Sequence, residues 1–407
     1  MSKFYITLIF VTLTLCIFSA GCLLPFDGSV QDPKLLGPNI SVPLAPIPVS
    51  SLDGANLAYE LEISSAGNQK FTPEKLEVID PSTGNILWTI DGDLLAALSH
   101  PASDPLPTEK ERQTGTGKLS IPRISIWFTV SEDAIPDQLT HRITFGQAGK
   151  DPVIVTGGTV DVRKDLQPVV IGSPFRGAGW LAMETTSPMT HHFLAQITMD
   201  SVTRVPQKYA QDWIYVDPKT GKAVNGNSTL ARDYLGYGKE IYAVSSGTVV
   251  DLLDGLPDVE CVYSAGTPSI ETAAGNYVIV DMGNDKYACY AHMIPETIRV
   301  SLGDTVSEGQ ILGLVGNSGN SDIPHLHFQI VTGKASFLGA EEYPHVYRSF
   351  DVIGQVNGDM ATQRQEKIPG YTFDRLFAEF SDFVTIHQDP VRRQNELPEN
   401  WDIVSFP

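Results

Sequence analysis

The feature that most limits the fold of this chain is a succession of short segments in which apolar and polar residues alternate. Successive side chains of an extended strand point to opposite faces, so a period of two predicts half-buried β-strands. Gly, Pro, Asn and Asp stand between the segments, as in the turns of antiparallel sheets. We therefore expect an all-β chain with an N-terminal β-sandwich over residues 51–167. Its expected strands are LAYELEI (57–63), KLEVID (75–80), ILWTI (86–90), ISIWFTV (124–130), HRITF (141–145) and PVIVTGGTVDV (152–162). No residue cluster in this module suggests chemistry, which favours a positioning or binding role.

A second strand-rich segment, expected over residues 168–350, carries more selective polar residues. Its strand-like runs lie within residues 240–253, 276–293 and 300–319. Glycines of the third run let the chain fold back tightly between short strands. In the remaining extension, 351–407, four apolar residues have helical spacing and predict one short helix that packs on a core. They are Phe373, Leu376, Phe377 and Phe380.

The first 22 residues have the composition of an export signal. Lys3 precedes the apolar run FYITLIFVTLTLCIF (4–18), which is shorter than the about 20 residues of a membrane span. Cys22 follows Ala-Gly and resembles the cysteine of a lipobox, although Ser19 stands where leucine is usual. A membrane lipoprotein anchored through Cys22 and a secreted protein therefore both stay open. Either places the mature protein outside the cytoplasm.

The proline, charge and cysteine content of the chain each limit its organisation or its possible ligands. Residues 23–50 contain many prolines, which predicts an extended linker after the signal. The formal net charge of −20 argues against binding of phosphate groups, including those of nucleic acid, and against adhesion to an anionic membrane, because both favour a basic surface. Beyond Cys22 only Cys261 and Cys289 remain, and the sequence leaves open whether they form a disulfide. There is no Cys-x-x-Cys motif, which excludes a thiolate zinc site.

Three histidines near the ends of the later strands form the most informative pattern. His325 and His327 flank Leu326 directly after the loop GNSGNSDIP (316–324), and residues two apart on a strand share a face. His292 ends another expected strand. A catalytic zinc site needs about three protein ligands and an open position for water. The His-x-His pair alone is equally consistent with a structural pair.

Three motifs occurring in order make the segment resemble the LytM-type, M23-family zinc endopeptidases. They are YAH (290–292), VSLGDTVSEGQILG (300–313) and GNSGNSDIPHLHF (316–328). This resemblance, over roughly residues 170–350, implies a β barrel-sandwich domain that holds Zn²⁺ and cuts peptides of the cell wall. It also implies that His327 is a zinc ligand and that His292 and His325 are catalytic.

The sequence departs from this family at the first metal-binding motif, which should read His-x-x-x-Asp. Asp212 is the best match for the aspartate, but Lys208 stands where the histidine is expected. A protonated lysine has no lone pair to offer a metal. Three alternatives stay open. The pair His191-His192 folds back and supplies the missing imidazole, with His192 as the expected ligand; Asp233 adds a carboxylate; or no metal binds and Lys208 pairs with Asp212.

Three functions follow from these features. We favour a zinc metalloendopeptidase acting on cell-wall peptide, and Lys208 keeps open a catalytically degenerate domain that binds or regulates wall hydrolases. A carrier domain would need an exposed lysine at a hairpin tip, and only Lys286 is near one, without the usual flanking methionines. The loops 217–239 and 254–275 are long. We expect them to wall a substrate groove and to narrow its specificity.

Overall fold

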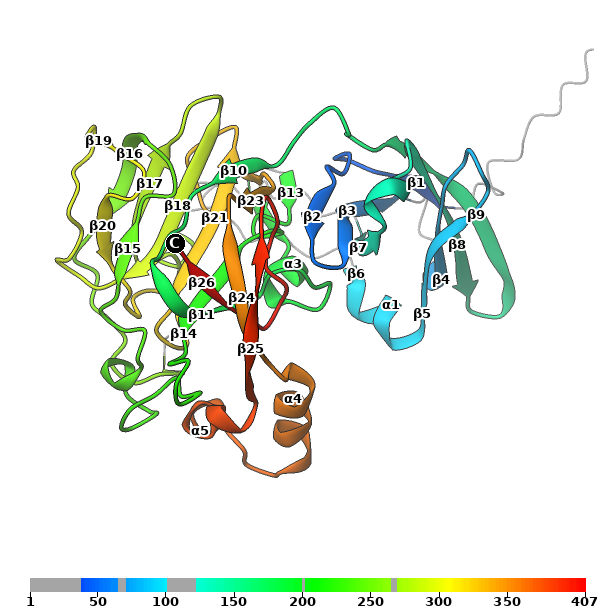
Figure 1. The fold of residues 1–407 in the computed structure, drawn as a ribbon. Coiled ribbons are helices and arrows are strands. Elements are labelled where there is room, and N and C mark those ends of the chain that lie inside the picture. The colour runs from blue at the N-terminus through cyan, green and yellow to red at the C-terminus, as the bar shows by residue number, and fades with distance from the viewer. Residues whose placement is uncertain (1–37, 65–70, 101–121, 200–201, 265–268) are drawn as a thin grey trace, which may run out of the picture. The chain divides into compact units, whose positions relative to one another are not determined.

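The computed structural model describes residues 38–64, 71–100, 122–199, 202–264 and 269–407 (Figure 1). Residues 37–407 form one compact unit. The predicted signal, with the lipobox at Cys22, lies outside the described residues. Strands predominate, so the predicted all-β class is confirmed. In the part of the chain that the structure describes, no helix has the length and apolarity of a membrane span.

Two antiparallel sheets form the N-terminal module, and all six strands expected there are present. The first sheet contains β1 (Asn39–Ser41), β2 (Val49–Ser51), β3 (Gly54–Ser64), β6 (Ser99–His100) and β7 (Arg123–Val130). The second contains β4 (Thr72–Ile79), β5 (Ile86–Asp91), β8 (Gln138–Gln147) and β9 (Lys150–Asp161). The helix α1 (Gly92–Leu98) and the 3-10 turn η2 (Glu132–Ala134) connect them. Inward residues of both sheets, such as Leu61 and Ile143, are fully buried.

Two of these strands begin within residues 23–50, the stretch expected to be a linker. Strands β1 and β2 both pair with β3. Ile40 and Val49 are buried, so this proline-rich segment gives apolar side chains to the core. Residues 23–37 lie outside the described part of the chain.

A large antiparallel sheet dominates the rest of the chain, and eleven of its strands lie in the described residues. Its order is β19-β16-β17-β18-β21-β14-β11-β26-β24-β25, with β22 paired to β21. The bounds are β11 (Gly177–Met183), β14 (Gln211–Tyr215), β16 (Gly247–Leu253), β17 (Asn276–Asp281), β18 (Lys286–Met293), β19 (Thr305–Val306), β21 (Leu326–Thr332), β22 (Glu341–Glu342), β24 (Phe350–Val356), β25 (Val384–Arg393) and β26 (Asp402–Phe406). Short pairs flank it: β10 (Val169–Ile171) with β23 (His345–Tyr347), β12 (Ile197–Met199) with β13 (Val202–Arg204), and β15 (Glu240–Tyr242) with β20 (Ile311–Leu314). The predicted tight turns are present, since Gly303 and Gly309 have φ of 89° and 79°.

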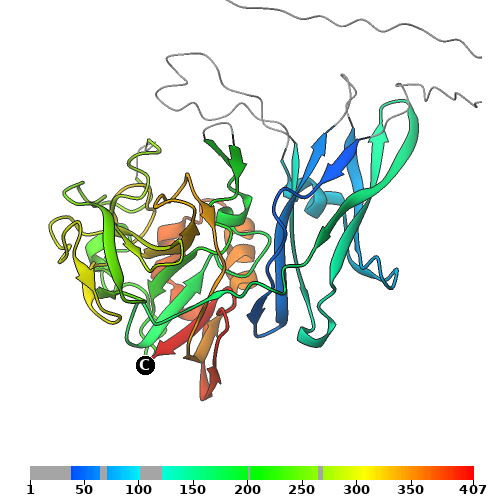
Figure 2. The same ribbon diagram turned by 90° about the horizontal axis from the view of Figure 1, so that it is seen from above.

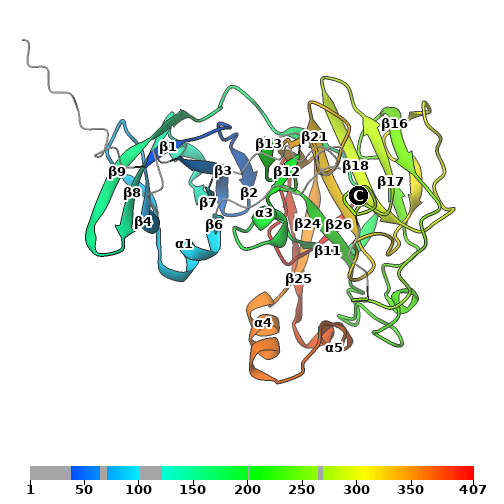
Figure 3. The ribbon, with the colours of Figure 1, turned by 180° about the vertical axis from the view of Figure 1, so that it is seen from behind.

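The C-terminal extension continues this sheet. Strand β26 lies between β11 and β24, as Figure 1 shows and Figure 2 shows from above. The predicted short helix is α5 (Phe373–Ala378), followed by the turn η4 (Phe380–Asp382). Leu376, Phe377 and Phe380 are buried as expected, whereas Phe373 is half exposed and stacks on Tyr263. Helix α4 (Gly358–Lys367), beside α5 in Figure 3, was not predicted because its sequence GDMATQRQEK is almost entirely polar.

Candidate metal centre

The pairing of β14 with β21 places Asp212 directly opposite His327. Directly opposed residues of an antiparallel pair share one face of the sheet. His327 Nδ1 accordingly lies 3.0 Å from Asp212 Oδ1. His325 immediately precedes β21, and its Nε2 lies 3.4 Å from the same oxygen. The sheet register therefore brings together three of the residues that the sequence singled out.

His192 reaches this cluster from a separate element, the four-residue helix α3 (His191–Leu194). Its Nε2 lies 3.5 Å from Asp212 Oδ2, and its ring centroid lies 4.7 Å from that of His327. One donor atom each of His192, Asp212 and His327 lies within 4.8 Å of the others. All three residues are buried. His191 instead points outward, with 68% of its side chain exposed, and forms an ion pair with Glu184 at 3.0 Å.

Hydrogen bonds fix which nitrogen of each imidazole is free. A carbonyl oxygen can only accept, so Nδ1–H of His192 donates to Glu184 O (3.3 Å) and Nε2–H of His327 donates to Gln329 Oε1 (2.8 Å). The Gln329 amide is itself oriented by donating to Pro206 O and Phe337 O. Lone pairs of His192 Nε2 and His327 Nδ1 are thus left on the side of Asp212. Such outer partners are what orient metal-binding histidines.

His292 and His325 lie beside these three residues. His292 has φ of 63°, donates its Nδ1–H to Ser318 O (2.8 Å), and has its ring centroid 4.7 Å from that of His325. His325 donates its Nδ1–H to Ile323 O (2.7 Å). In both residues Nδ1 is occupied by a backbone carbonyl, so Nε2 is the nitrogen that can exchange a proton.

Burial and the charges within the cluster set the protonation of its members. Burial would raise the pKa of Asp212, but His192 and His325 outweigh it and hold that pKa well below its usual value. Burial lowers the pKa of His192 to about 3 and that of His292 well below its usual value. Burial also opposes the charged form of His325, yet Asp212 outweighs it and raises the pKa of His325. The carboxylate is therefore ionised while His192 and His292 are neutral, which is the state that binds metal.

This donor set fits Zn²⁺. Two imidazole nitrogens and one carboxylate oxygen are the ligand types of catalytic zinc sites, and three protein ligands leave a position for water. Gln329 and Glu184, which orient the two imidazoles, were not found from the sequence. Gln329 lies two residues after His327, so strand alternation alone could have indicated it.

Lys208 does not form the ion pair with Asp212 that was expected for a metal-free domain; its partners are Glu60 and Glu341. Its Nζ lies 2.9 Å from Glu60 Oε1 and 3.9 Å from Glu341 Oε1. Burial opposes the charged form, but the two carboxylates outweigh it and raise the pKa of Lys208. Asp233 also lies elsewhere, and its Oδ2 accepts a hydrogen bond from Asn227 N at 2.7 Å in a loop. Among the described residues it belongs to no group of potential metal ligands.

A pocket of about 1000 Å³ opens over the histidines. The loop 254–275 lines it through Tyr263, Ile270 and Glu271, as the length of this loop predicted. The loop 217–239, which lies entirely in the described part of the chain, contributes no lining residue, so it does not wall this pocket. A further wall comes from the C-terminal extension through Phe373 and Trp401, among others.

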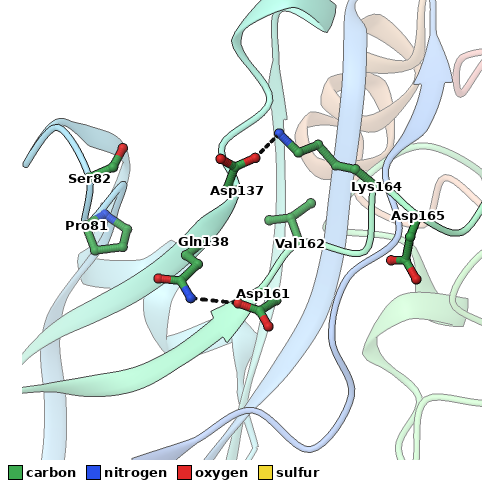
Figure 4. Close-up of a pocket in the computed structure, with 8 residues that line it drawn as sticks. All are labelled: Pro81, Ser82, Asp137, Gln138, Asp161, Val162, Lys164 and Asp165. Atoms are coloured by element: carbon green, nitrogen blue, oxygen red, sulfur yellow. Dashed lines mark hydrogen bonds and ion pairs between the residues drawn. The ribbon is translucent and has the colours of Figure 1, made fainter.

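A second hollow lies in the N-terminal module and is lined largely by polar residues (Figure 4). Lys164 forms an ion pair with Asp137, and Gln138 Nε2 donates to Asp161 Oδ1 at 2.7 Å. Asp165 accepts two hydrogen bonds from Arg163. These carboxylates are paired with neighbours, and none of the described residues that line the hollow is a histidine or cysteine, so they form no catalytic arrangement there. The two cysteines of the folded region are also unpaired: Cys261 is exposed and Cys289 is buried.

Part of this chain is similar in sequence to known peptidases. Residues 233–337 match the sequence model of Peptidase family M23. Peptidoglycan DD-endopeptidase ShyA of Vibrio cholerae serotype O1 is 43% identical over 58 residues, which are 14% of this chain and 13% of ShyA. Endolysin 2638A of Staphylococcus phage 2638A is 35% identical over 94 residues, 22% of this chain and 16% of the endolysin.

Among solved structures, the catalytic domain of lysostaphin from Staphylococcus simulans is 29% identical, covering 26% of this chain and 69% of that domain, with a TM-score of 0.20. The chain spans less than a fifth of the length of the curated relatives it matches. The matched range contains His292, His325 and His327. It begins after His192 and Asp212, which therefore lie outside it.

Proposed function

We propose that this protein is an exported zinc metalloendopeptidase, which hydrolyses peptide bonds of cell-wall peptides. The premise of this proposal is that residues 233–337 are a domain of peptidase family M23. The observation that supports this most strongly is the cluster of His192, Asp212 and His327, because it restores three ligands despite Lys208. The apolar N-terminal run favours export, and Cys22 favours a lipid anchor on the membrane.

In this proposal His192, Asp212 and His327 hold the zinc. A zinc ion held by these residues would supply a Lewis acid, which polarises a peptide carbonyl and activates water. His292 and His325 stand beside the ligands with Nδ1 held by backbone carbonyls. Their Nε2 atoms accept a proton from the attacking water, pass a proton to the leaving nitrogen and donate hydrogen bonds to the oxygen that gains charge. Burial keeps bulk water from competing for these hydrogen bonds.

The degenerate alternative rested on Lys208, and the location of that side chain weakens it. Lys208 would repel a cation if it faced Asp212, but its ammonium is neutralised by Glu60. The pocket over the histidines is also large enough for a short peptide segment.

The first test is zinc content. The purified protein should bind about one zinc per chain by mass spectrometry, and both His192→Ala and His327→Ala should lose it because two protein ligands bind zinc poorly. His191→Ala is the matched control, since it removes the adjacent exposed imidazole and should keep the metal. If His192→Ala retained zinc, His192 would not be a metal ligand. If the parent protein bound no zinc, the proposed zinc peptidase function would be refuted.

A further inference from the structure

The position of His192 depends on contacts outside its own helix. Helix α3 has four residues, and a single turn has no stability of its own in water. Thr190 caps it by accepting a hydrogen bond from Phe193 N at 3.2 Å. The orientation of the His192 ring must otherwise come from what α3 packs on, which makes its tertiary contacts part of the metal site.

Phe193, next to His192, carries the main contact. Its side chain is fully buried and meets the ring of Trp127 edge-to-face, with centroids 5.3 Å apart and an interplanar angle of 88°. Trp127 belongs to β7 of the N-terminal sandwich. Its Nε1 donates to Asn56 Oδ1 on β3 at 3.2 Å, which fixes the orientation of the indole. The sandwich thus supplies the surface that α3 rests on.

The same indole also contacts the segment that leads to Asp212. Tyr209 lies three residues before Asp212, and its ring centroid is 5.7 Å from that of Trp127. The hydroxyl of Tyr209 donates to Ala58 O on β3 at 3.5 Å. One side chain of the sandwich therefore supports both segments that bring His192 and Asp212 together.

Two charged contacts anchor the chain between these segments to the sandwich. Arg123 on β7 donates from Nη1 to Thr203 O in β13 at 2.8 Å. Lys208 forms its buried ion pair with Glu60 on β3, and both side chains are less than 5% exposed. The position where the family's first ligand is expected is thus occupied by a residue that binds the sandwich instead.

We infer that the N-terminal sandwich is a working part of the metal centre, and that Trp127 and Phe193 are positioning residues that hold His192 in ligand geometry. The inference rests on the proposed zinc site. It explains how the chain tolerates Lys208: the replacement imidazole lies on a segment that the sandwich immobilises. It predicts that zinc affinity responds to substitutions in β7, a strand that contributes no metal ligand.

The test is zinc affinity of the whole purified protein, measured by competition with a chromogenic chelator. Trp127→Ala should weaken zinc binding 10- to 100-fold, the range seen when partners of metal ligands are lost. Trp88→Ala is the matched control, because Trp88 lies on β5 in the other sheet of the same sandwich and stacks on Phe128 with centroids 5.9 Å apart. It should change the affinity less than about threefold.

Phe193→Leu serves if Trp127→Ala fails to fold, since it keeps the site apolar while removing the edge-to-face contact. Phe193→Leu should also weaken zinc binding. The melting temperature of the zinc-free variant should stay within a few degrees of that of the zinc-free parent. Equal affinity of the parent, Trp127→Ala and Phe193→Leu would overturn the inference while leaving the zinc site intact. An equal loss in Trp88→Ala would also overturn it, because general loosening of the sandwich would then suffice. A parent without zinc would instead refute the proposed function, and this inference with it.

Discussion

Replacement of Lys208 by methionine tests whether this residue is a structural substitute for a ligand. Its ammonium and the Glu60 carboxylate are 3% and 4% exposed and 2.9 Å apart. At an effective dielectric constant of about 20, two unit charges at this distance attract by roughly 6 kcal/mol, much of which offsets their desolvation. Removing one partner leaves the other buried and unpaired, which costs about 3–5 kcal/mol. We expect Lys208→Met to lower the free energy of unfolding by about 4 kcal/mol at pH 7.

The effect should depend on pH because a second carboxylate is involved. Burial raises the pKa of Glu341, and Lys208 opposes that rise. Without Lys208 the pKa of Glu341 should rise further above its unfolded value. A carboxyl group whose folded pKa is raised destabilises the fold fully above that pKa, and this penalty declines as the pH falls from the folded pKa toward the unfolded pKa. The deficit of Lys208→Met should therefore be smaller at pH 5 than at pH 7.

The assay is urea unfolding of the zinc-free protein at both pH values, followed by tryptophan fluorescence. The double variant Glu60→Gln with Lys208→Met should recover at least 2 kcal/mol of the loss, because no uncompensated charge remains on that pair. Lys164→Met is the control, since Lys164 pairs with Asp137 at the surface and should change stability by less than about 1 kcal/mol. A deficit below about 1 kcal/mol for Lys208→Met, or a double variant as unstable as the single one, would refute this account of the buried pair.

Three further predictions concern other contacts. Gln329→Leu removes the acceptor of the His327 Nε2–H and should weaken zinc binding 10- to 100-fold by chelator competition, with Gln138→Leu as a surface control. Hydrogen bonds from Arg142 and Lys75 lower the pKa of Glu77 from 4.5 to about 2, so this carboxylate stabilises the fold above pH 4.5 and loses its effect as the pH falls toward 2. Glu77→Gln should therefore cost about 1 kcal/mol in urea unfolding at pH 7 and nothing near pH 2; an equal cost at both would contradict the ionic origin. A thiol reagent should label Cys261 in the native protein and Cys289 only after unfolding, as mass spectrometry of the peptides would show.

The strands and the register of the site could be predicted from local patterns. Alternation located the strands of the sandwich, and the spacing of His325 and His327 placed both on one side of β21. The position of His192 could not be derived in this way, because Trp127, far away in the sequence, supports α3. The location of Lys208 was missed for the same reason, since its partner Glu60 belongs to the other module.

The C-terminal extension shows a different limit. Its helix α5 followed from apolar spacing, whereas α4 has only one buried residue, Ala361, and gave no apolar pattern. The strand pairing of β26 with β11 depends on a partner that no local signal identifies. The pocket wall from this extension was therefore also missed.

The place of β26 in the sheet has a consequence for biosynthesis. Strand β11 pairs with β14 on one side and with β26 on the other. Strand β14 is synthesised soon after β11, whereas β26 is synthesised last among the described strands. Until then the apolar strand GAGWLAM presents an open edge on which another nascent chain could pair. The sheet is therefore completed only after β26 has been synthesised, and the edge of β11 stays unpaired until then.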